Sequence, residues 1–417
     1  MPDLRNPGLL RQVLAQADIR LFLISSFVSN VGLWVQRVAV GWLVFDLTHS
    51  AGWVGTVAAC ELVPSLLVAP FGGVLSDRGD RFRLLVCGQV AAQAQAFALA
   101  AFAWFDSLGL VTLTVAAITL GLIDGINQPP RLMLASDVSP RPLLPTTVAL
   151  NSFGFNAARF VGPIVAGLAL TAGSPALAFA INGVSFLPFI LLLLRLKRSP
   201  AIRRPTAGPG DGVVGGLRHA AHHPVLGLAL MLLLSVSLGV RGMVELLPAI
   251  AGKWFGPAPS DLAALTVSVG IGAMLGGVWL LRLGSLPKVL SAVLIGPGGL
   301  AFGMLLFAGL GDIRWLAHLL LAGIGFLSLV CGSGTQSLIH LTANPAYRGR
   351  VLSLFGIIQR AGPAIGALML GLLADAVGLS PAFVVGAVLA GLAWGWVWIR
   401  RRRLQKAIDD FAGSGDA

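Results

Sequence analysis

Long apolar runs separated by short polar stretches repeat along the whole sequence. Each run has eighteen or more residues with few charges, enough for a helix to cross a hydrocarbon core of about 30 Å. The short alternating segments of a membrane barrel are absent, so the runs predict helices and an all-α membrane protein. We expect twelve membrane-spanning helices, at residues 19–46, 51–76, 84–105, 108–134, 145–170, 175–195, 225–252, 262–283, 286–310, 313–341, 351–374 and 380–400.

The charge content and its placement support this interpretation. Only 11% of residues are charged and 56% are hydrophobic, whereas a soluble domain has about 25% charged residues. With both termini on one side of the membrane, 23 of the 29 lysines and arginines fall on that side, and only Lys253 and Arg314 fall opposite. This asymmetry predicts a cell-membrane protein with both termini cytoplasmic. Contact with membrane lipids therefore accounts for the net charge of +12, and we expect no nucleic-acid partner.

A polar connection divides the spans into six plus six. We expect an N-terminal six-helix bundle at 1–196, a cytoplasmic central loop at 197–224, and a C-terminal six-helix bundle with a basic cytoplasmic tail at 225–417. "FVGPIVAG" in the fifth span is echoed two hundred residues later by "AGPAIGAL" in the eleventh. The echo suggests an internal repeat, in which Gly162 and Pro163, like Gly362 and Pro363, allow close helix packing.

The densest mixed charge lies in "GGVLSDRGDRFRLL", between the second and third spans. Asp77, at the end of the second span, can accept hydrogen bonds from arginines or from the first amides of a neighbouring helix. Such a contact can hold the halves of the protein in one arrangement and break in another. The alternative is that the loop only marks a cytoplasmic turn and enforces topology, although acidic residues contribute little to that signal.

Six plus six helices with this loop resemble the major facilitator superfamily of secondary transporters. The stretches "SNVGLWVQRVAVGWLVFDLTHSAGWVG", "LNSFGFNAARFVGPIVAG" and "RGRVLSLFGIIQRAGPAIGALMLGLLADAVG" are similar to the branch that contains enterobactin exporters and macrolide efflux proteins. The resemblance implies a cavity between the two halves and a gating loop that stabilises the outward-facing state. The positions that match this loop are Gly73, Asp77, Arg78, Arg81 and Arg83.

Three acidic residues lie inside spans, where an ionisable group is costly and therefore a candidate functional site. Glu61, Asp124 and Glu245 can each load and release a proton, and we favour Glu61 because Pro64 loosens its helix. The alternative for Glu61 and Asp124 is a fixed salt bridge to a facing arginine. Glu245 stands four residues after Arg241, so the two can pair on one helix face.

Polar side chains within the spans are candidates for lining a substrate cavity, or alternatively for hydrogen bonding between helices. The interior arginines exceed the interior acids by one, which favours an anionic ligand. The cavity candidates are Asn30, Gln36, Arg37, Asn127, Gln128, Arg159, Arg241, Gln336 and Arg360.

These features predict a proton-coupled exporter of small molecules, siderophore or drug-like, that works by alternating access. The alternatives are a uniporter or importer of a small metabolite, or a lipid flippase on the same fold. The sequence contains no Walker-type glycine loop, no nucleophile with a base, and no metal-ligand spacing. We therefore expect a transporter rather than an enzyme, without a cofactor or a metal, with protons and a small-molecule substrate as partners, and monomeric.

Overall fold

The computed structural model describes residues 7–78, 80–196, 218, 220, 223, 225–256, 258–283 and 286–401; the side chains of residues 7, 8, 77, 78, 281, 286, 345 and 346 are outside this description. All regular structure in these ranges is helical. Within them, twelve helical segments are long and apolar enough to cross a membrane. The all-α prediction and the predicted number of spans are confirmed. The protein is a multi-pass membrane protein.

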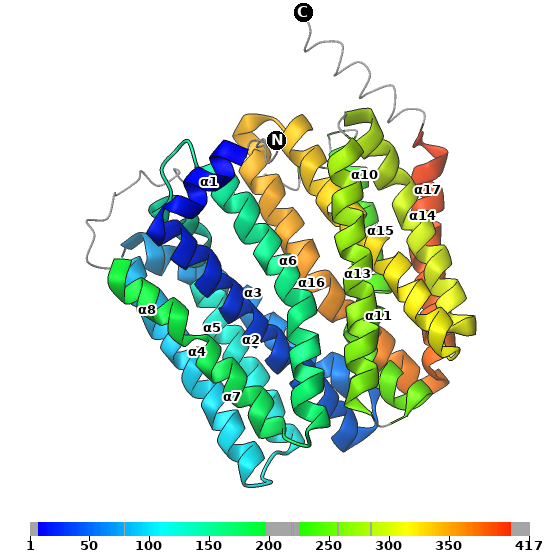
Figure 1. The fold of residues 1–417 in the computed structure, drawn as a ribbon. Helices are drawn as coiled ribbons and strands as arrows, with labels where there is room; N and C mark the ends of the chain where they lie inside the picture. Colours follow the sequence, from blue (N-terminus) through cyan, green and yellow to red (C-terminus); the bar gives the residue numbers. More distant parts are fainter. Residues whose placement is uncertain are drawn as a thin grey trace, which may run out of the picture. The chain divides into compact units, whose positions relative to one another are not determined.

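The first half of the chain contains α1 (Pro7–Ala15), α2 (Ala17–Thr48), α3 (Ala51–Arg78), α4 (Arg81–Trp104), α5 (Leu110–Val138), α6 (Leu144–Thr171), α7 (Pro175–Ser185) and α8 (Leu187–Leu196). The second half contains α10 (Leu226–Val236), η1 (Ser237–Arg241), α11 (Gly242–Glu245), α12 (Leu247–Ile250), η2 (Ala251–Phe255), α13 (Pro259–Leu283), α14 (Leu286–Leu310), α15 (Arg314–Thr342), α16 (Pro345–Val377) and α17 (Leu379–Ile399). Figure 1 carries these labels.

The chain forms two compact units. The first consists of Met1–Thr48, Cys60–Ala207 and Ala258–Ala263, and the second of His49–Ala59, Gly208–Pro257 and Ala264–Ala417. Helix α3 therefore gives its first turns to the second unit and the rest to the first. The domain borders expected from the sequence stay a prediction, and most of the central loop 197–224 lies outside the described residues.

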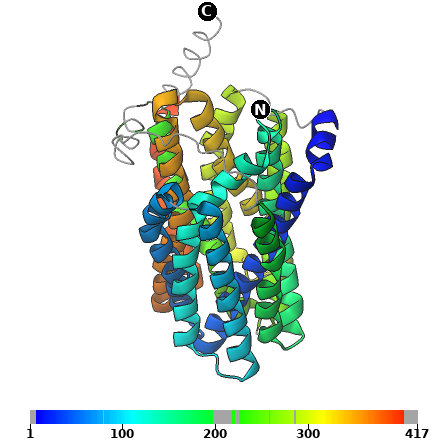
Figure 2. The same ribbon diagram turned by 90° about the vertical axis from the view of Figure 1, so that its left-hand side faces the viewer.

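In the first unit, α2 packs against α5, α6, α7 and α8, and α4 packs against α5, α7 and α8. These helices run roughly along one direction, and the turn that joins α4 to α5 is short (Figures 1 and 2). Phe22, Leu85, Leu134 and Phe189 form part of the apolar core. Apolar side chains such as Leu67 remain exposed on the outer helix faces, as expected for contact with lipid.

In the second unit, α14 packs against α15 and α17, and α16 packs against η1, α11 and α17. The seventh span departs from the continuous helix that the sequence predicted at 225–252. It is interrupted by two π-helical turns, η1 and η2, and by a break at Leu246, after which Pro248 lies in the first turn of α12. The sixth span is likewise divided at Phe186, two residues before Pro188, because a proline has no amide to continue the helix ladder.

Candidate functional site

An ion pair joins α2 to α3 in the first unit. Glu61 Oε1 accepts hydrogen bonds from Arg37 Nε at 2.9 Å and from Arg37 Nη2 at 2.6 Å. The Arg37 side chain is 33% exposed and that of Glu61 is 20% exposed, so both are half-buried. The structure thus gives Glu61 the facing arginine that the sequence offered as one alternative. Both donors reach a single carboxylate oxygen, a charge-assisted contact that holds Glu61 in place.

Trp34 brings a second arginine to this pair. The guanidinium carbon of Arg37 lies 5.3 Å from the centre of the Trp34 ring, and that of Arg159, on α6, lies 5.0 Å from it. Helix α6 reaches this position because Gly162 packs on α2, where any added Cβ would overlap the Trp34 Cβ. We call Trp34, Arg37, Glu61 and Arg159 the Trp34 site. It contains two guanidinium groups and one carboxylate.

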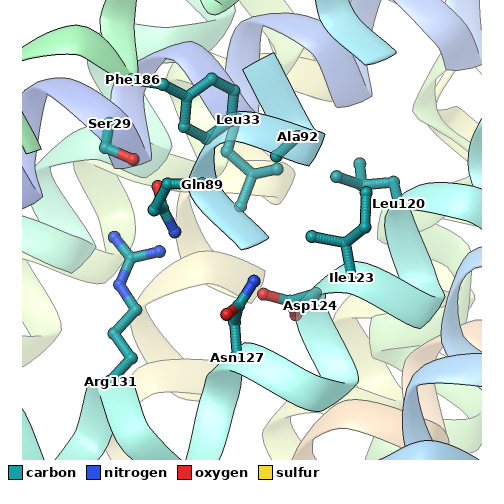
Figure 3. A pocket seen from close by; sticks show the side chains of 10 residues that line it. All are labelled: Ser29, Leu33, Gln89, Ala92, Leu120, Ile123, Asp124, Asn127, Arg131 and Phe186. Atoms are coloured by element: carbon teal, nitrogen blue, oxygen red, sulfur yellow. The ribbon is translucent and has the colours of Figure 1, made fainter. Parts of the chain in front are cut away.

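A small polar pocket lies between α2, α4 and α5 in the same unit (Figure 3). Its volume is about 20 Å³. Figure 3 shows polar side chains from the three helices turned toward one space, with the Asp124 carboxylate and the Asn127 amide side by side. We call this space the Asp124 pocket. Its lining residues are Ser29, Leu33, Gln89, Ala92, Leu120, Ile123, Asp124, Asn127, Arg131 and Phe186.

Arg131 is fixed at the edge of the Asp124 pocket by two contacts. Its Nη2 donates to Asn30 Oδ1 at 3.3 Å, and its guanidinium lies 5.0 Å from the centre of the Phe189 ring. Arg131 was not singled out from the sequence, although it lies within the fourth predicted span at 108–134. In the structure α5 continues past Pro129 and Pro130 to Val138, so Arg131 remains on the helix that carries Asp124.

Some predicted cavity residues instead bond to neighbouring helices. Gln36 is buried, donates to Gln95 Oε1 at 3.1 Å, and accepts from Asn182 Nδ2 at 2.7 Å. Gln128 is half-buried on α5 and does not line the Asp124 pocket. The Gln36 contacts match the alternative of interhelical hydrogen bonding rather than substrate contact.

The predicted residues of the second unit are more scattered. Arg241, at the end of η1, donates to Gln359 Oε1 on α16, and Glu245 is half-buried at the end of α11. Gln336 and Arg360 are exposed. Buried Gly362 allows close contact between α16 and η1, since an added Cβ would overlap Ser237, and Pro363 beside it is buried as well.

The predicted gating loop is described only in part. The side chains of Asp77 and Arg78 lie outside the described residues, so the predicted latch does too. Arg81 forms an ion pair with Asp137 at 2.7 Å, and the amide of Arg83 donates to Asp80, which caps α4. An added Cβ on Gly73 would meet nothing within 4 Å.

Sequence reasoning missed a second charged cluster, in the second unit. The Asp375 carboxylate accepts hydrogen bonds from the Ala51 and Gly52 amides, both at 2.9 Å, and from the Ser50 hydroxyl. Lys253 Nζ lies 3.6 Å from Asp375 Oδ1. Asp375 thus caps the first turn of α3 from α16, a contact that satisfies amides left without partners at a helix start.

Reasoning from the sequence also missed Ser29, Gln89 and Arg131. A usable signal existed for Gln89, because α4 carries three glutamines in an otherwise apolar span, "GQVAAQAQA". Polar side chains at this depth need partners. Ser29 gave no comparable signal, since isolated serines are common in membrane helices.

Comparison with known proteins places this arrangement among transporters. Residues 12–412 match the family described as transmembrane secretion effector. The chain is 23% identical over 394 residues to the staphyloferrin A transporter of Staphylococcus aureus. This match covers 88% of this chain and 92% of that protein. It is 24% identical over 404 residues to the enterobactin exporter of an Escherichia coli strain, with 95% of each chain covered.

Solved structures agree on the fold. A bacterial homologue of the human lysosomal transporter Spinster, inward-facing and unoccupied, has a TM-score of 0.71 at 14% identity, over 93% of this chain and 98% of that chain. A peptide transporter in complex with sulfate has a TM-score of 0.71 at 14% identity, and the match covers 95% of this chain and 98% of that chain. These structures confirm the fold, and the family match confirms the resemblance seen in the sequence.

Proposed function

Because the chain belongs to the transmembrane secretion effector family of major facilitator transporters, we propose that it exports small anionic molecules in exchange for protons. Its similarity to a staphyloferrin A transporter and to enterobactin exporters supports a siderophore-like substrate. The proposed mechanism is alternating access, in which one binding site opens to the two sides of the membrane in turn.

The observation that carries the proposal is the Trp34 site. Charged groups at membrane depth are costly and mark substrate or ion pathways. Within this group two guanidinium groups stand against one carboxylate, and both lie over one aromatic ring. Guanidinium groups repel a lipophilic cation and attract an anion.

The chemistry of these side chains suits a carboxylate or catecholate ligand. A planar guanidinium donates paired hydrogen bonds to such groups, and an indole ring packs against an aromatic or apolar ligand. The ligand would replace Glu61 as the acceptor of the Arg37 donors. Glu61 is then the group that binds the Arg37 guanidinium when substrate is absent.

Coupling to protons requires a carboxylate that changes its protonation during the transport cycle. In the proposed cycle the loaded carrier turns outward and releases the anion, and the empty carrier returns with a proton bound. Glu61, Asp124 and Glu245 are the candidates within the spans. Of these, Glu61 already accepts two hydrogen bonds from Arg37 on one of its carboxylate oxygens.

Transport in inverted membrane vesicles with an imposed pH gradient tests the proposal. We expect accumulation of enterobactin or staphyloferrin A that depends on the gradient, and no accumulation of the lipophilic cation ethidium. Accumulation of ethidium with exclusion of both siderophores would overturn the anionic assignment. Siderophore transport that does not depend on the pH gradient would indicate a uniporter. Transport of lipid alone would indicate a flippase.

Two further parts of the proposal rest on the sequence. The charge asymmetry supports cytoplasmic termini, which a C-terminal reporter active only in the cytoplasm would test. The charged loop supports a gate in which Asp77 stabilises one state. The protein is proposed to act as a monomer, which light scattering of the purified protein would check.

A further inference from the structure

The Asp124 pocket contains buried polar atoms that lack hydrogen-bond partners within the described part of the chain. These atoms are Ser29 Oγ, Gln89 Oε1 and Asn127 Oδ1. Their side chains are only 1%, 4% and 3% exposed, and they come from α2, α4 and α5. An unpartnered buried polar group costs about 1–3 kcal/mol. Three such groups lining one small space therefore point to a ligand that they share.

The pocket is the right size for one water molecule. Its volume of about 20 Å³ exceeds the roughly 10–15 Å³ that a single water requires. A water donates only two hydrogen bonds, which Gln89 Oε1 and Asn127 Oδ1 can accept, while the Ser29 hydroxyl can donate to the water. The Asp124 carboxyl faces the same space (Figure 3), and in its protonated form it can donate to the remaining lone pair of the water. We propose that a water bound by Ser29, Gln89 and Asn127 makes Asp124 the proton-binding site of the transport cycle.

The lining of the pocket suits a proton on Asp124 better than a bound metal cation. Arg131, on the same helix, lines the pocket and would repel a sodium ion or a divalent cation. On the neighbouring helices, Glu61 of α3, Arg37 of α2 and Arg159 of α6 do not line the pocket, and α4 contributes the uncharged Gln89. A proton on Asp124 needs no further ligands, whereas Ca²⁺ or Mg²⁺ takes about six oxygen ligands or more.

Close packing links the Asp124 pocket to the Trp34 site. Gly121 and Gly125 of α5 lie against the carbonyl oxygens of Glu61 and Ser65 on α3, so closely that a Cβ on either glycine would overlap them. The register of α3 on α5 therefore fixes Glu61 beside the turn that precedes Asp124. A shift of α5 on protonation of Asp124 would move Glu61 and the arginine that it holds.

This inference rests on the proposed exchange of substrate for protons, but its first test does not require transport. Infrared difference spectra of the purified protein in lipid vesicles, recorded between low and high pH, report protonated carboxyl groups. We expect a carboxylic-acid band that Asp124→Asn removes. Asp106→Asn, in the exposed turn between α4 and α5, is the matched control and should keep the band.

The water is tested by a pair of variants on one helix. Gln89→Leu removes a proposed water ligand and should shift the carboxylic-acid band. Gln93→Leu, one turn further along α4, removes a hydrogen bond to the Gly183 carbonyl and should leave the band unchanged. A band that persists in Asp124→Asn, or that Gln89→Leu does not shift, overturns the inference.

Transport then separates this inference from the proposed function. If the wild-type protein shows no accumulation driven by a pH gradient, the proposed exchange fails. If wild type shows it and Asp124→Asn retains it, the exchange stands and the assignment to Asp124 fails. We expect Asp124→Asn to lose accumulation driven by the gradient while still exchanging labelled siderophore for unlabelled siderophore, which also shows that the variant is folded.

Discussion

Replacing Glu61 by glutamine should strengthen the binding of an anionic substrate. In the structure Glu61 Oε1 accepts two charge-assisted hydrogen bonds from Arg37, and the substrate has to displace this carboxylate. Glutamine keeps an acceptor oxygen at the same place but removes its charge. Arg37 would then hold its internal partner less tightly and be more available to a ligand.

The size of the effect follows from the two hydrogen bonds. A hydrogen bond to a charged group is worth about 1.5–3 kcal/mol. In Glu61→Gln only Arg37 remains charged, so each bond loses part of this value, about 1 kcal/mol. Because the Arg37 side chain is 33% exposed, screening reduces the total to roughly 1–2 kcal/mol. Glu61→Gln should therefore bind the anion about tenfold more tightly. Arg37→Gln should weaken binding by about tenfold to a hundredfold.

Titration calorimetry with enterobactin and staphyloferrin A would measure both variants, and the double variant would complete a cycle that isolates their coupling. Weaker binding by Glu61→Gln would refute the reasoning, because Glu61 would then contact the substrate rather than compete with it. Accumulation driven by a pH gradient should survive this substitution. If Glu61→Gln lost this accumulation but still bound substrate, the proton-binding site would be Glu61 rather than Asp124.

Three other substitutions test separate parts of the structure. Gly121→Ala would place a methyl group against the Glu61 carbonyl, so overpacking should lower the free energy of unfolding by about 1–3 kcal/mol and the melting temperature with it. Gly73→Ala, where a methyl group meets nothing within 4 Å, is the control. Equal melting temperatures for the two variants would contradict the close packing at Gly121. Asp375→Ala removes the cap of α3 and should cost about 0.5–2 kcal/mol in thermal unfolding, so an unchanged unfolding temperature would argue against the cap. Asp77→Asn should insert normally but transport poorly, and full transport in vesicles would exclude the gating role.

The spans could be predicted from the sequence because the requirement for crossing a membrane is met by consecutive residues. Each crossing needs about twenty consecutive apolar residues, and this requirement appears in the chain without knowledge of its neighbours. The interruptions were harder to predict. Pro188 and Pro248 stand beside the breaks in the sixth and seventh spans, but nothing in the residue pattern indicated the π-helical turns η1 and η2.

Partners between helices could not be predicted in the same way. Gln36 bonds to residues 59 and 146 positions away, and no local pattern encodes such a pairing. The sequence offered both a facing arginine and a free carboxylate for Glu61, and only the packing of α2 on α3 shows which group it meets. The Asp124 pocket was half predicted, through Asp124 and Asn127, because Ser29 and Gln89 come from different helices.

The pair of arginines at the Trp34 site has an electrical consequence. A bacterial cell is negative inside, so an anion that leaves moves with the membrane voltage, worth about 2.3 kcal/mol per charge at 100 mV. That energy alone would support a concentration ratio of roughly fifty for a monoanion. A proton that enters in exchange moves charge in the same direction, so the voltage would favour both halves of the cycle. By selecting the sign of the ligand, Arg37 and Arg159 would also determine how strongly the membrane potential drives each turnover.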